Sequence, residues 1–407
     1  MAGPLSHIRV LDLSRVLAGP WASQNLADLG AEVIKIERPG SGDDSRAFGP
    51  PWIRDGQGRE TKDSAYFSSA NRGKKSLTLN IAVAEGQAIA RELAAKCDVL
   101  LENYKYGDLA RYGLGYDDLR KVNPRLVYCS VTGFGQTGPY RERPGYDFMI
   151  QGMGGMMSVT GEPDDAPGGG PQRAGVPIAD IITGMYASIA ICAALAHRER
   201  SGKGQHLDLA LLDSQIALLA YQNTNYFATG RPPKRIGNLH PNIVPYQPFR
   251  ASDGEVILAC GNDNLYRKFC DAAGCAELAQ DPRFATNGKR VENRAELTRL
   301  LAEVFKKRSK REWLELLEAA GVPNGPINDI AQVFEEPQVK ARGIRMELPH
   351  GAGASLPLVA SPMRFSDTGL EYRSAPPLLG EHTEEVLREL LGKSQDDVAR
   401  LRSAAVI

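Results

Sequence analysis

The sequence has no excess of charge of either sign, because 49 Lys and Arg residues balance 49 Asp and Glu residues among 407. Proteins that bind nucleic acid or an anionic membrane through electrostatics carry a basic surface. The composition therefore predicts neither partner. The six cysteines include no C-x-x-C pair, and no histidine cluster stands beside them. We expect reduced thiols, with no disulfide framework and no metal site.

Several common sequence signals are also missing. The turn after the first expected strand reads SRVLAGP rather than G-x-G-x-x-G, and no G-x-x-x-x-G-K-[ST] string occurs. These absences disfavour a nicotinamide or flavin cofactor and P-loop phosphoryl transfer. The start, MAGPLSHIRVLDLS, contains neither a secretory signal nor an Arg-rich transit peptide, so we expect a cytoplasmic protein.

The segments that are present alternate between strands and helices. The patterns predict a strand over residues 8–13, a short helix over 21–29 and a second strand over 32–37. This βαβ unit is the start of a parallel, doubly wound sheet. The length favours two domains. Residues 231–249 are rich in Pro, Gly and Asn, which indicates a linker that can also cover a site.

Residues 175–200 are the most informative stretch. From Ile181 to Ala196 the residues are apolar or small on every side, which predicts a helix buried in a core, too short for the roughly 20 residues of a bilayer span. Asp180 stands at its N-terminal end, where free backbone N–H groups favour a negative charge and lower a carboxyl pKa. Asp180 is then either a helix cap or an ionised carboxylate nucleophile, and periodicity does not decide between them.

Other candidates follow strand ends, where ligands of α/β sheets collect. Arg38 follows the second strand, and Asn103, Tyr104 and Lys105 follow a strand expected over 97–103. Arginine binds phosphate bidentately, and an aromatic ring can stack on a base. The alternative is a solvated surface arginine. Lys74 and Lys75 are typical of a solvated surface pair.

The string AGVPIADIITGMYA resembles the nucleophile segment of the family III CoA-transferases, in which the acid before x-x-T-G carries the acyl group and then CoA. VLDLSRVLAGP at Val10, SVTGFGQTGP at Ser130 and PPLLGEHTEEVL at Pro376 agree with the family in order. The resemblance implies an α/β fold with a Rossmann-like large domain and parallel sheet, a smaller α+β domain and an interlaced homodimer. It implies no tightly bound cofactor, since CoA is a substrate.

The resemblance also assigns roles to individual positions. Asp180 is the implied nucleophile, and backbone N–H groups at the start of its helix and nearby glycines are expected to hold the oxyanion. The implied CoA contacts are Leu17, Ala18, Arg38, Leu79, Asn80, Asn103, Tyr104, Lys105, Arg111, Arg143, Gly145 and Tyr146. The implied substrate-binding residues are Asp147, Arg235, Gly237, Asn238 and His240.

Asp147 has two interpretations: an acid that tunes Asp180, or a structural carboxylate bonded to backbone. For the domains, we expect the first part of the large domain over 1–225, the small domain with its lid over 226–335, and a segment returning to the large domain over 336–407.

Four strings are similar to the branch of the family that transfers CoA from succinyl-CoA to dicarboxylates such as glutarate and hydroxymethylglutarate: RVLAGP at Arg15, IVPYQPF at Ile243, GVPNGPIN at Gly321 and EEPQVKARG at Glu335. Formyl-CoA transferases have a run of glycines where this chain has GNLHPN. We therefore expect the lid to hold the second carboxylate of a diacid, through His240 or Arg235.

Two other functions stay open. An α-methylacyl-CoA racemase uses a His–Asp pair in a G-H-D segment, whereas this chain has Gly145-Tyr146-Asp147. Tyrosine, with a pKa near 10, is a poor base at neutral pH. The second alternative is a non-catalytic CoA-ester binding protein on the same fold.

Overall fold

The computed structural model describes residues 2–407, which form two compact units. The first unit contains the chain up to residue 156 together with 174–229 and 340–407, and the second contains 157–173 and 230–339. The sequence places 157–173 in the first unit. The structure groups this segment with the second, because Gly237 N donates to Gly161 O at 3.0 Å and Arg235 forms an ion pair with Asp164.

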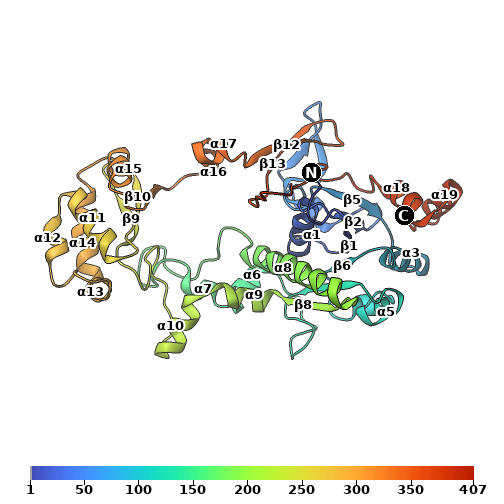
Figure 1. Ribbon diagram of the computed structural model, residues 1–407, viewed down its shortest axis with the longest axis horizontal. Coiled ribbons are helices and arrows are strands. Elements are labelled where there is room, and N and C mark those ends of the chain that lie inside the picture. Colours follow the sequence, from blue (N-terminus) through green and yellow to red (C-terminus); the bar gives the residue numbers. More distant parts are fainter. Residues whose placement is uncertain (1) are drawn as a thin grey trace. The chain divides into compact units, whose positions relative to one another are not determined.

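Six parallel strands form the sheet of the first unit (Figure 1). They are β1 Arg9–Asp12, β2 Glu32–Glu37, β5 Lys74–Thr78, β6 Val99–Glu102, β7 Val127–Thr132 and β8 His206–Ala210. Their order across the sheet is β5-β2-β1-β6-β7-β8. The chain therefore winds outward from β1 in both directions, which is the Rossmann arrangement expected from the sequence. The winding reverses between β1 and β6, where sheets of this kind open their ligand crevice.

Helices cover both faces of this sheet. One face carries α1 Ala18–Asp28, α6 Asp147–Met153, α8 Ile178–Ser201 and the start of α9 Leu211–Leu218. The other face carries α3 Ala84–Ala94, α5 Tyr116–Val122, α18 Thr383–Leu391 and α19 Gln395–Ser403. Because side chains alternate along a strand, Val10 enters the first core and Leu11 the second.

Shorter elements complete the first unit. They are η1 Asp44–Ala47, β3 Trp52–Arg54, β4 Glu60–Ser64, α2 Ala65–Ser68, α4 Asp108–Arg111, α10 Tyr221–Thr229, β12 Arg345–Pro349 and β13 Ser355–Val359. Helices α9 and α10 are separate elements, because Ala220 between them adopts a left-handed conformation with φ +45°, which a right-handed helix does not contain.

The second unit has its own antiparallel sheet and core. Its strands are β9 Tyr246–Arg250, β10 Glu255–Ala259 and β11 Asn324–Pro326, and its helices are α11 Asp263–Ala273, α12 Ala276–Gln280, α13 Asn287–Glu292, α14 Arg294–Phe305, α15 Lys310–Ala319 and α16 Ile330–Glu335. Two short helices, α7 Met156–Val159 and α17 Pro337–Ala341, lie where the chain passes between units. Phe305 stacks on Phe249 and Trp313 in the core, with ring centroids 4.6 and 4.4 Å apart.

The burial of helix α8 differs from the prediction. In residues 2–407 it is the one helix long and apolar enough to cross a membrane, and 44% of its most apolar window is buried within the protein. It packs against α1, where a Cβ on Gly184 would lie 2.6 Å from Ala18 O. On its other side Met185, Tyr186 and Ile189 are exposed. The prediction of burial on every side is therefore wrong for one side of α8 in the single chain.

Candidate active site

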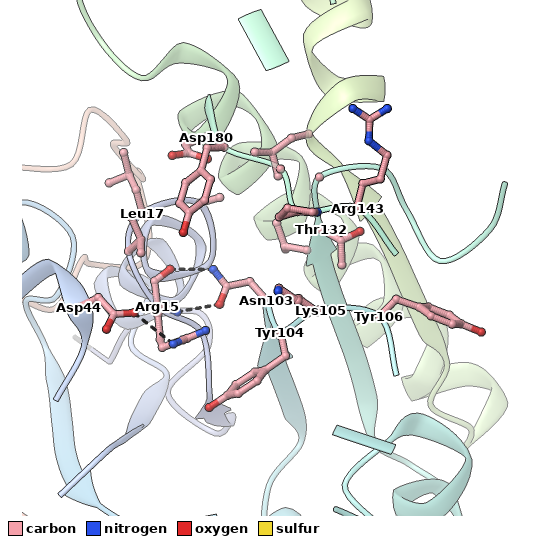
Figure 2. Close-up of a pocket in the computed structure, with 18 of the residues that line it drawn as sticks. Arg15, Leu17, Asp44, Asn103, Tyr104, Lys105, Tyr106, Thr132, Arg143 and Asp180 are labelled. Atoms are coloured by element: carbon pink, nitrogen blue, oxygen red, sulfur yellow. Dashed lines mark hydrogen bonds and ion pairs between the residues drawn. The ribbon is translucent and has the colours of Figure 1, made fainter. Parts of the chain in front are cut away.

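Asp180 lies in the first turn of α8 and lines a cavity of about 160 Å³ (Figure 2). Three loops form the other walls: residues 15–18 after β1, 103–106 after β6, and 131–146 after β7. The cavity therefore opens at the carboxyl ends of β1, β6 and β7, beside the point where the strand order reverses. The half-buried Asp180 carboxylate has no hydrogen-bond or ion-pair partner among residues 2–407.

The neighbouring acid, Asp147, caps α8. Its Oδ1 accepts hydrogen bonds from Ala179 N at 2.8 Å and from Asp180 N at 3.4 Å. Its Oδ2 accepts one from Gln151 Nε2 at 2.7 Å, and Gln151 Oε1 in turn accepts from Ala174 N at 2.9 Å. Asp147 is buried. Since Asp147 satisfies the N–H groups at the start of α8, Asp180 is not the helix cap, and its side chain is left for chemistry.

The same arrangement changes the acidity of Asp180. Burial, followed by repulsion from the Asp147 carboxylate, raises the pKa of Asp180 to about 7. The expectation that the helix terminus lowers this pKa is wrong, because Asp147 occupies the N–H groups and adds a like charge. A carboxylate with a raised pKa holds its electron pair less tightly. It is a better nucleophile than a solvated aspartate and is still substantially ionised at neutral pH.

Most of the implied CoA contacts lie in the Asp180 cavity. These are Leu17, Ala18, Asn103, Tyr104, Lys105, Arg143, Gly145 and Tyr146. The cavity also contains residues that the sequence did not single out: Arg15, Val16, Asp44, Tyr106, Val131, Thr132, Gly133, Arg141, Pro144 and Leu211. Arg15 and Val16 belong to the same RVLAGP string as Leu17. The family resemblance that identified Leu17 could therefore have identified them as well.

A second cavity, of about 300 Å³, shares Arg15 and Tyr104 with the first. It is lined by the predicted residues Arg38, Leu79 and Asn80. Arg111 lines neither cavity; it is exposed and forms an ion pair with Asp108. The two cavities together suit a long ligand with an anionic end near Arg38 and its reacting end at Asp180.

Asn103 shapes the site through the backbone. Its Oδ1 accepts from Arg15 N at 2.9 Å, and its Nδ2 donates to Arg15 O at 2.7 Å, as the dashed lines in Figure 2 show. The Arg15 guanidinium pairs with Asp44 at 3.1 Å and lies 4.9 Å from the centre of the Tyr104 ring. The side-chain amide of Asn103 is thus fully engaged in fixing the β1–α1 loop.

Gly145 has a steric reason to be glycine. A Cβ at this position would lie 2.4 Å from Gly133 Cα, so the two ends of the loop after β7 approach too closely for any side chain. The adjacent Tyr146 is 71% exposed and borders the cavity from outside.

Free backbone donors lie at the start of α1 and not of α8. The amides of Leu17 and Ala18 have no hydrogen-bond partner among residues 2–407. Both residues line the Asp180 cavity, and α1 is 11 residues long, so its dipole is positive at this end. The expectation that the start of α8 supplies oxyanion donors is wrong, because Asp147 already accepts from those N–H groups.

Lys74 and Lys75 are not a solvated pair. Lys74 is buried and its Nζ donates to Asn71 Oδ1 at 2.9 Å and to Asp12 at 3.2 Å. Lys75 pairs with Glu32 and Glu385 at 2.9 and 2.7 Å. Ion pairs with acidic residues therefore explain why neither lysine is a free surface charge.

The expected lid residues belong to the second unit. Arg235 pairs with Asp164, Gly237 has φ +61°, and the His240 ring lies 5.2 Å from the Tyr246 ring. Burial, followed by the charge of Arg294, lowers the pKa of His240. The role of these residues and of Asn238 toward Asp180 stays a prediction, since each unit is described by itself.

The site and the sheet together define an α/β protein with an unpaired carboxylate in a cavity at the carboxyl ends of its parallel strands. A family model described as CoA-transferase family III matches residues 5–383. The chain is 51% identical to a succinate–glutarate CoA-transferase of Agrobacterium fabrum, over 95% of this chain and 96% of that one. It is 43% identical to the human succinyl-CoA:glutarate CoA-transferase, over 99% of this chain and 90% of that one.

A solved structure of a CaiB/BaiF family protein from Brucella suis superposes with a TM-score of 0.82 and 51% identity, covering 96% of this chain and 100% of that one. The chain belongs to CoA-transferase family III. The family and fold expected from the sequence are thereby confirmed. The relatives cited are named CoA-transferases, which favours CoA transfer over the racemase and binding-protein alternatives.

The Asp147→Asn variant tests the electrostatic coupling. If Asp180 is the nucleophile, only its ionised form attacks, so kcat/KM should rise with pH through the Asp180 pKa of about 7 and be lost as pH falls through it. Removing the Asp147 charge lowers the pKa of Asp180, so the midpoint of the kcat/KM profile should move to lower pH. The exposed Asp213→Asn variant is the control and should leave the midpoint in place. An unchanged midpoint for Asp147→Asn would refute the coupling.

Proposed function

We propose that this protein transfers CoA between succinyl-CoA and a C4–C6 dicarboxylate such as glutarate, with Asp180 as the nucleophile. The observation that carries this proposal is the unpaired Asp180 carboxyl, which lies in a cavity with the free amides of Leu17 and Ala18. The names of the relatives from Agrobacterium fabrum and human support the choice of donor and acceptor.

The transfer takes place in two matched halves. The Asp180 carboxylate attacks the thioester carbonyl, and the C–S bond breaks to give a mixed anhydride and CoA thiolate. The thiolate then attacks the aspartyl carbonyl, which frees the donor acid and leaves an Asp180–CoA thioester. The acceptor carboxylate attacks this thioester and releases the thiolate. The thiolate finally attacks the acceptor acyl carbon, forming the new acyl-CoA and regenerating Asp180.

The chain's own groups stabilise these steps. Each attack places negative charge on a carbonyl oxygen, and the unpaired amides of Leu17 and Ala18, which line the cavity at the positive end of α1, are the donors we propose for it. The raised pKa of Asp180 keeps its carboxylate reactive. Arg38 and the second cavity provide room and positive charge for the nucleotide part of CoA.

Trapping of the covalent intermediate tests the nucleophile. Incubation with succinyl-CoA followed by hydroxylamine should modify the peptide that contains Asp180, because both the anhydride and the thioester are acylating agents. Asp180→Asn should lose the adduct and the transfer activity, whereas Asp213→Asn should keep both. CoA transfer near the wild-type rate by Asp180→Asn would refute this mechanism.

The acceptor proposal rests on charge pairing. A diacid carries a second carboxylate, which needs a partner when it leaves water. The segment 231–242 supplies cations and polar groups, with His240 and Arg235 the proposed partners. Arg235 is largely buried and already pairs with Asp164, and its Nε has no partner among the described residues.

Glutarate should therefore be a better acceptor than butyrate by about ten- to a hundredfold in kcat/KM, or roughly 1.5–3 kcal/mol, because one charged hydrogen bond is lost. Arg235→Gln or His240→Ala should reduce this ratio, and the exposed Arg250→Gln should not. Equal kcat/KM values for the two acids would contradict the dicarboxylate proposal and leave CoA transfer intact.

We further propose that the protein is a homodimer, interlaced as the family resemblance implies. Met185, Tyr186 and Ile189 of α8 are 41–61% exposed, and Phe227 of α10 is 76% exposed. Large exposed apolar side chains grouped on one helix face, as on α8, mark an interaction site in soluble proteins. A second copy of the chain is the occupant we propose for this face.

Light scattering after size exclusion should give twice the chain mass of 44.2 kDa. Ile189→Glu should weaken assembly, because it buries an unpaired charge. Val122→Glu, at a 49% exposed position on α5, is the control and should remain dimeric. A monomeric wild-type protein, or one that requires detergent or lipid to stay in solution, would refute the proposed dimer.

A further inference from the structure

Val16 has an unusual backbone conformation for its residue type. Its φ is +70°, and it is the one β-branched residue among the three non-glycine residues with positive φ in residues 2–407. Branching at Cβ makes the left-handed region especially unfavourable, so such an outlier persists only where its surroundings impose it. Val16 lines the Asp180 cavity and directly precedes Leu17, the N-cap residue of α1.

A buried carboxylate binds the backbone N–H of Val16. Val16 N donates to Asp43 Oδ1 at 3.1 Å and to Oδ2 at 3.3 Å. Asp43 follows β2 and its side chain is 0% exposed. The same carboxylate accepts from Ser45 N at 2.9 Å and from Ser45 Oγ at 2.7 Å. The preceding residue, Arg15, is held at both its N–H and its carbonyl by Asn103.

Lys35 supplies the counter-charge. Its Nζ lies 2.8 Å from Asp43 Oδ2, and it also donates to Ser14 O at 2.7 Å. Although burial opposes ionisation, the charge of Lys35 and the bonds from Ser45 hold the pKa of Asp43 below its usual range. Lys35 and Asp43 therefore bind the β1–α1 loop at Ser14 O and Val16 N, respectively. Asp43 does not line the Asp180 cavity, but it is among the residues around the second cavity.

We propose that Asp43 is a positioning residue for the transfer reaction: by binding Val16 N–H it holds residue 16 in the left-handed conformation that aims the Leu17 and Ala18 amides at the carbonyl under attack. This inference rests on the proposed function, because it needs the oxyanion that Asp180 creates. If residue 16 relaxed to negative φ, the next two peptide planes would turn and the free N–H groups would leave the cavity.

Glycine offers a direct way to separate this role from simple stabilisation. Glycine adopts positive φ about as readily as negative φ and needs no carboxylate to hold it there. Alanine does not, because its Cβ meets the same steric restriction as valine. If Asp43 acts through the conformation of residue 16, glycine at that position makes Asp43 less necessary, and alanine does not.

The experiment uses the full chain with succinyl-CoA and glutarate, and compares kcat, KM and thermal midpoint. Asp43→Asn should lower kcat about ten- to a hundredfold, with KM for succinyl-CoA changed by less than about threefold, since the lost donors act on the transition state. Val16→Gly alone gives the reference kcat for the double variant, because glycine reaches positive φ without a carboxylate to hold it there. The double variant Asp43→Asn/Val16→Gly should recover most of the lost kcat, whereas Asp43→Asn/Val16→Ala should not.

A second variant covers the case in which Asp43→Asn does not fold. Ser45→Ala removes one bond to the Asp43 carboxylate and should give a smaller loss of kcat that Val16→Gly again reverses. The inference is overturned if glycine at residue 16 restores no kcat in a folded variant, if alanine restores it equally, or if only the thermal midpoint changes. Failure of the proposed function differs: the wild-type protein would then give no transfer at all.

Discussion

The buried ion pairs beneath the β1–α1 loop are the constraint on which the site depends. Lys35 with Asp43, and Lys74 with Asp12, are both 0% exposed at their side chains. Removing one partner from such a pair leaves an uncompensated charge in the core, at a cost of about 3–5 kcal/mol. The pairs are therefore retained together, and they fix the loop that carries the free amides of Leu17 and Ala18.

Two neighbouring carboxylates, Asp147 and Asp180, have different roles at the start of α8. Asp147 uses both oxygens on hydrogen bonds and caps the helix, while Asp180 keeps its oxygens free. After burial, repulsion from the Asp147 carboxylate also raises the pKa of Asp180. Asp147 therefore both caps the helix and raises the pKa of Asp180, and the carboxylate oxygens of Asp180 remain without a hydrogen-bond partner among residues 2–407.

The sheet keeps the Rossmann order without its glycine-rich turn. In dinucleotide-binding proteins that turn brings backbone amides to a pyrophosphate. Here the corresponding loop contains the left-handed Val16 and leads into α1 at Leu17. The strand order still opens a crevice between β1 and β6. The two cavities that share Arg15 and Tyr104 lie at this crevice, and one of them ends at Asp180.

The sequence by itself determined the sheet and much of the cavity lining. Strong periodicity located β2 at Glu32–Glu37, and the candidate ligand residues after β2 and β6 follow from the rule that binding takes place at the carboxyl ends of strands. The family resemblance added Asp180. These features are local, because each depends on a few consecutive residues.

Tertiary structure alone decided the chemistry around these positions. Lys74 is buried because it meets Asp12, which lies 62 residues earlier in the chain. The pKa of Asp180 rises because it is partly buried and Asp147 lies beside it, and the free amides lie on α1 because Asp147 accepts from those of α8. Charge pairing, desolvation and hydrogen-bond satisfaction depend on which distant residues meet in space, and no local pattern encodes that.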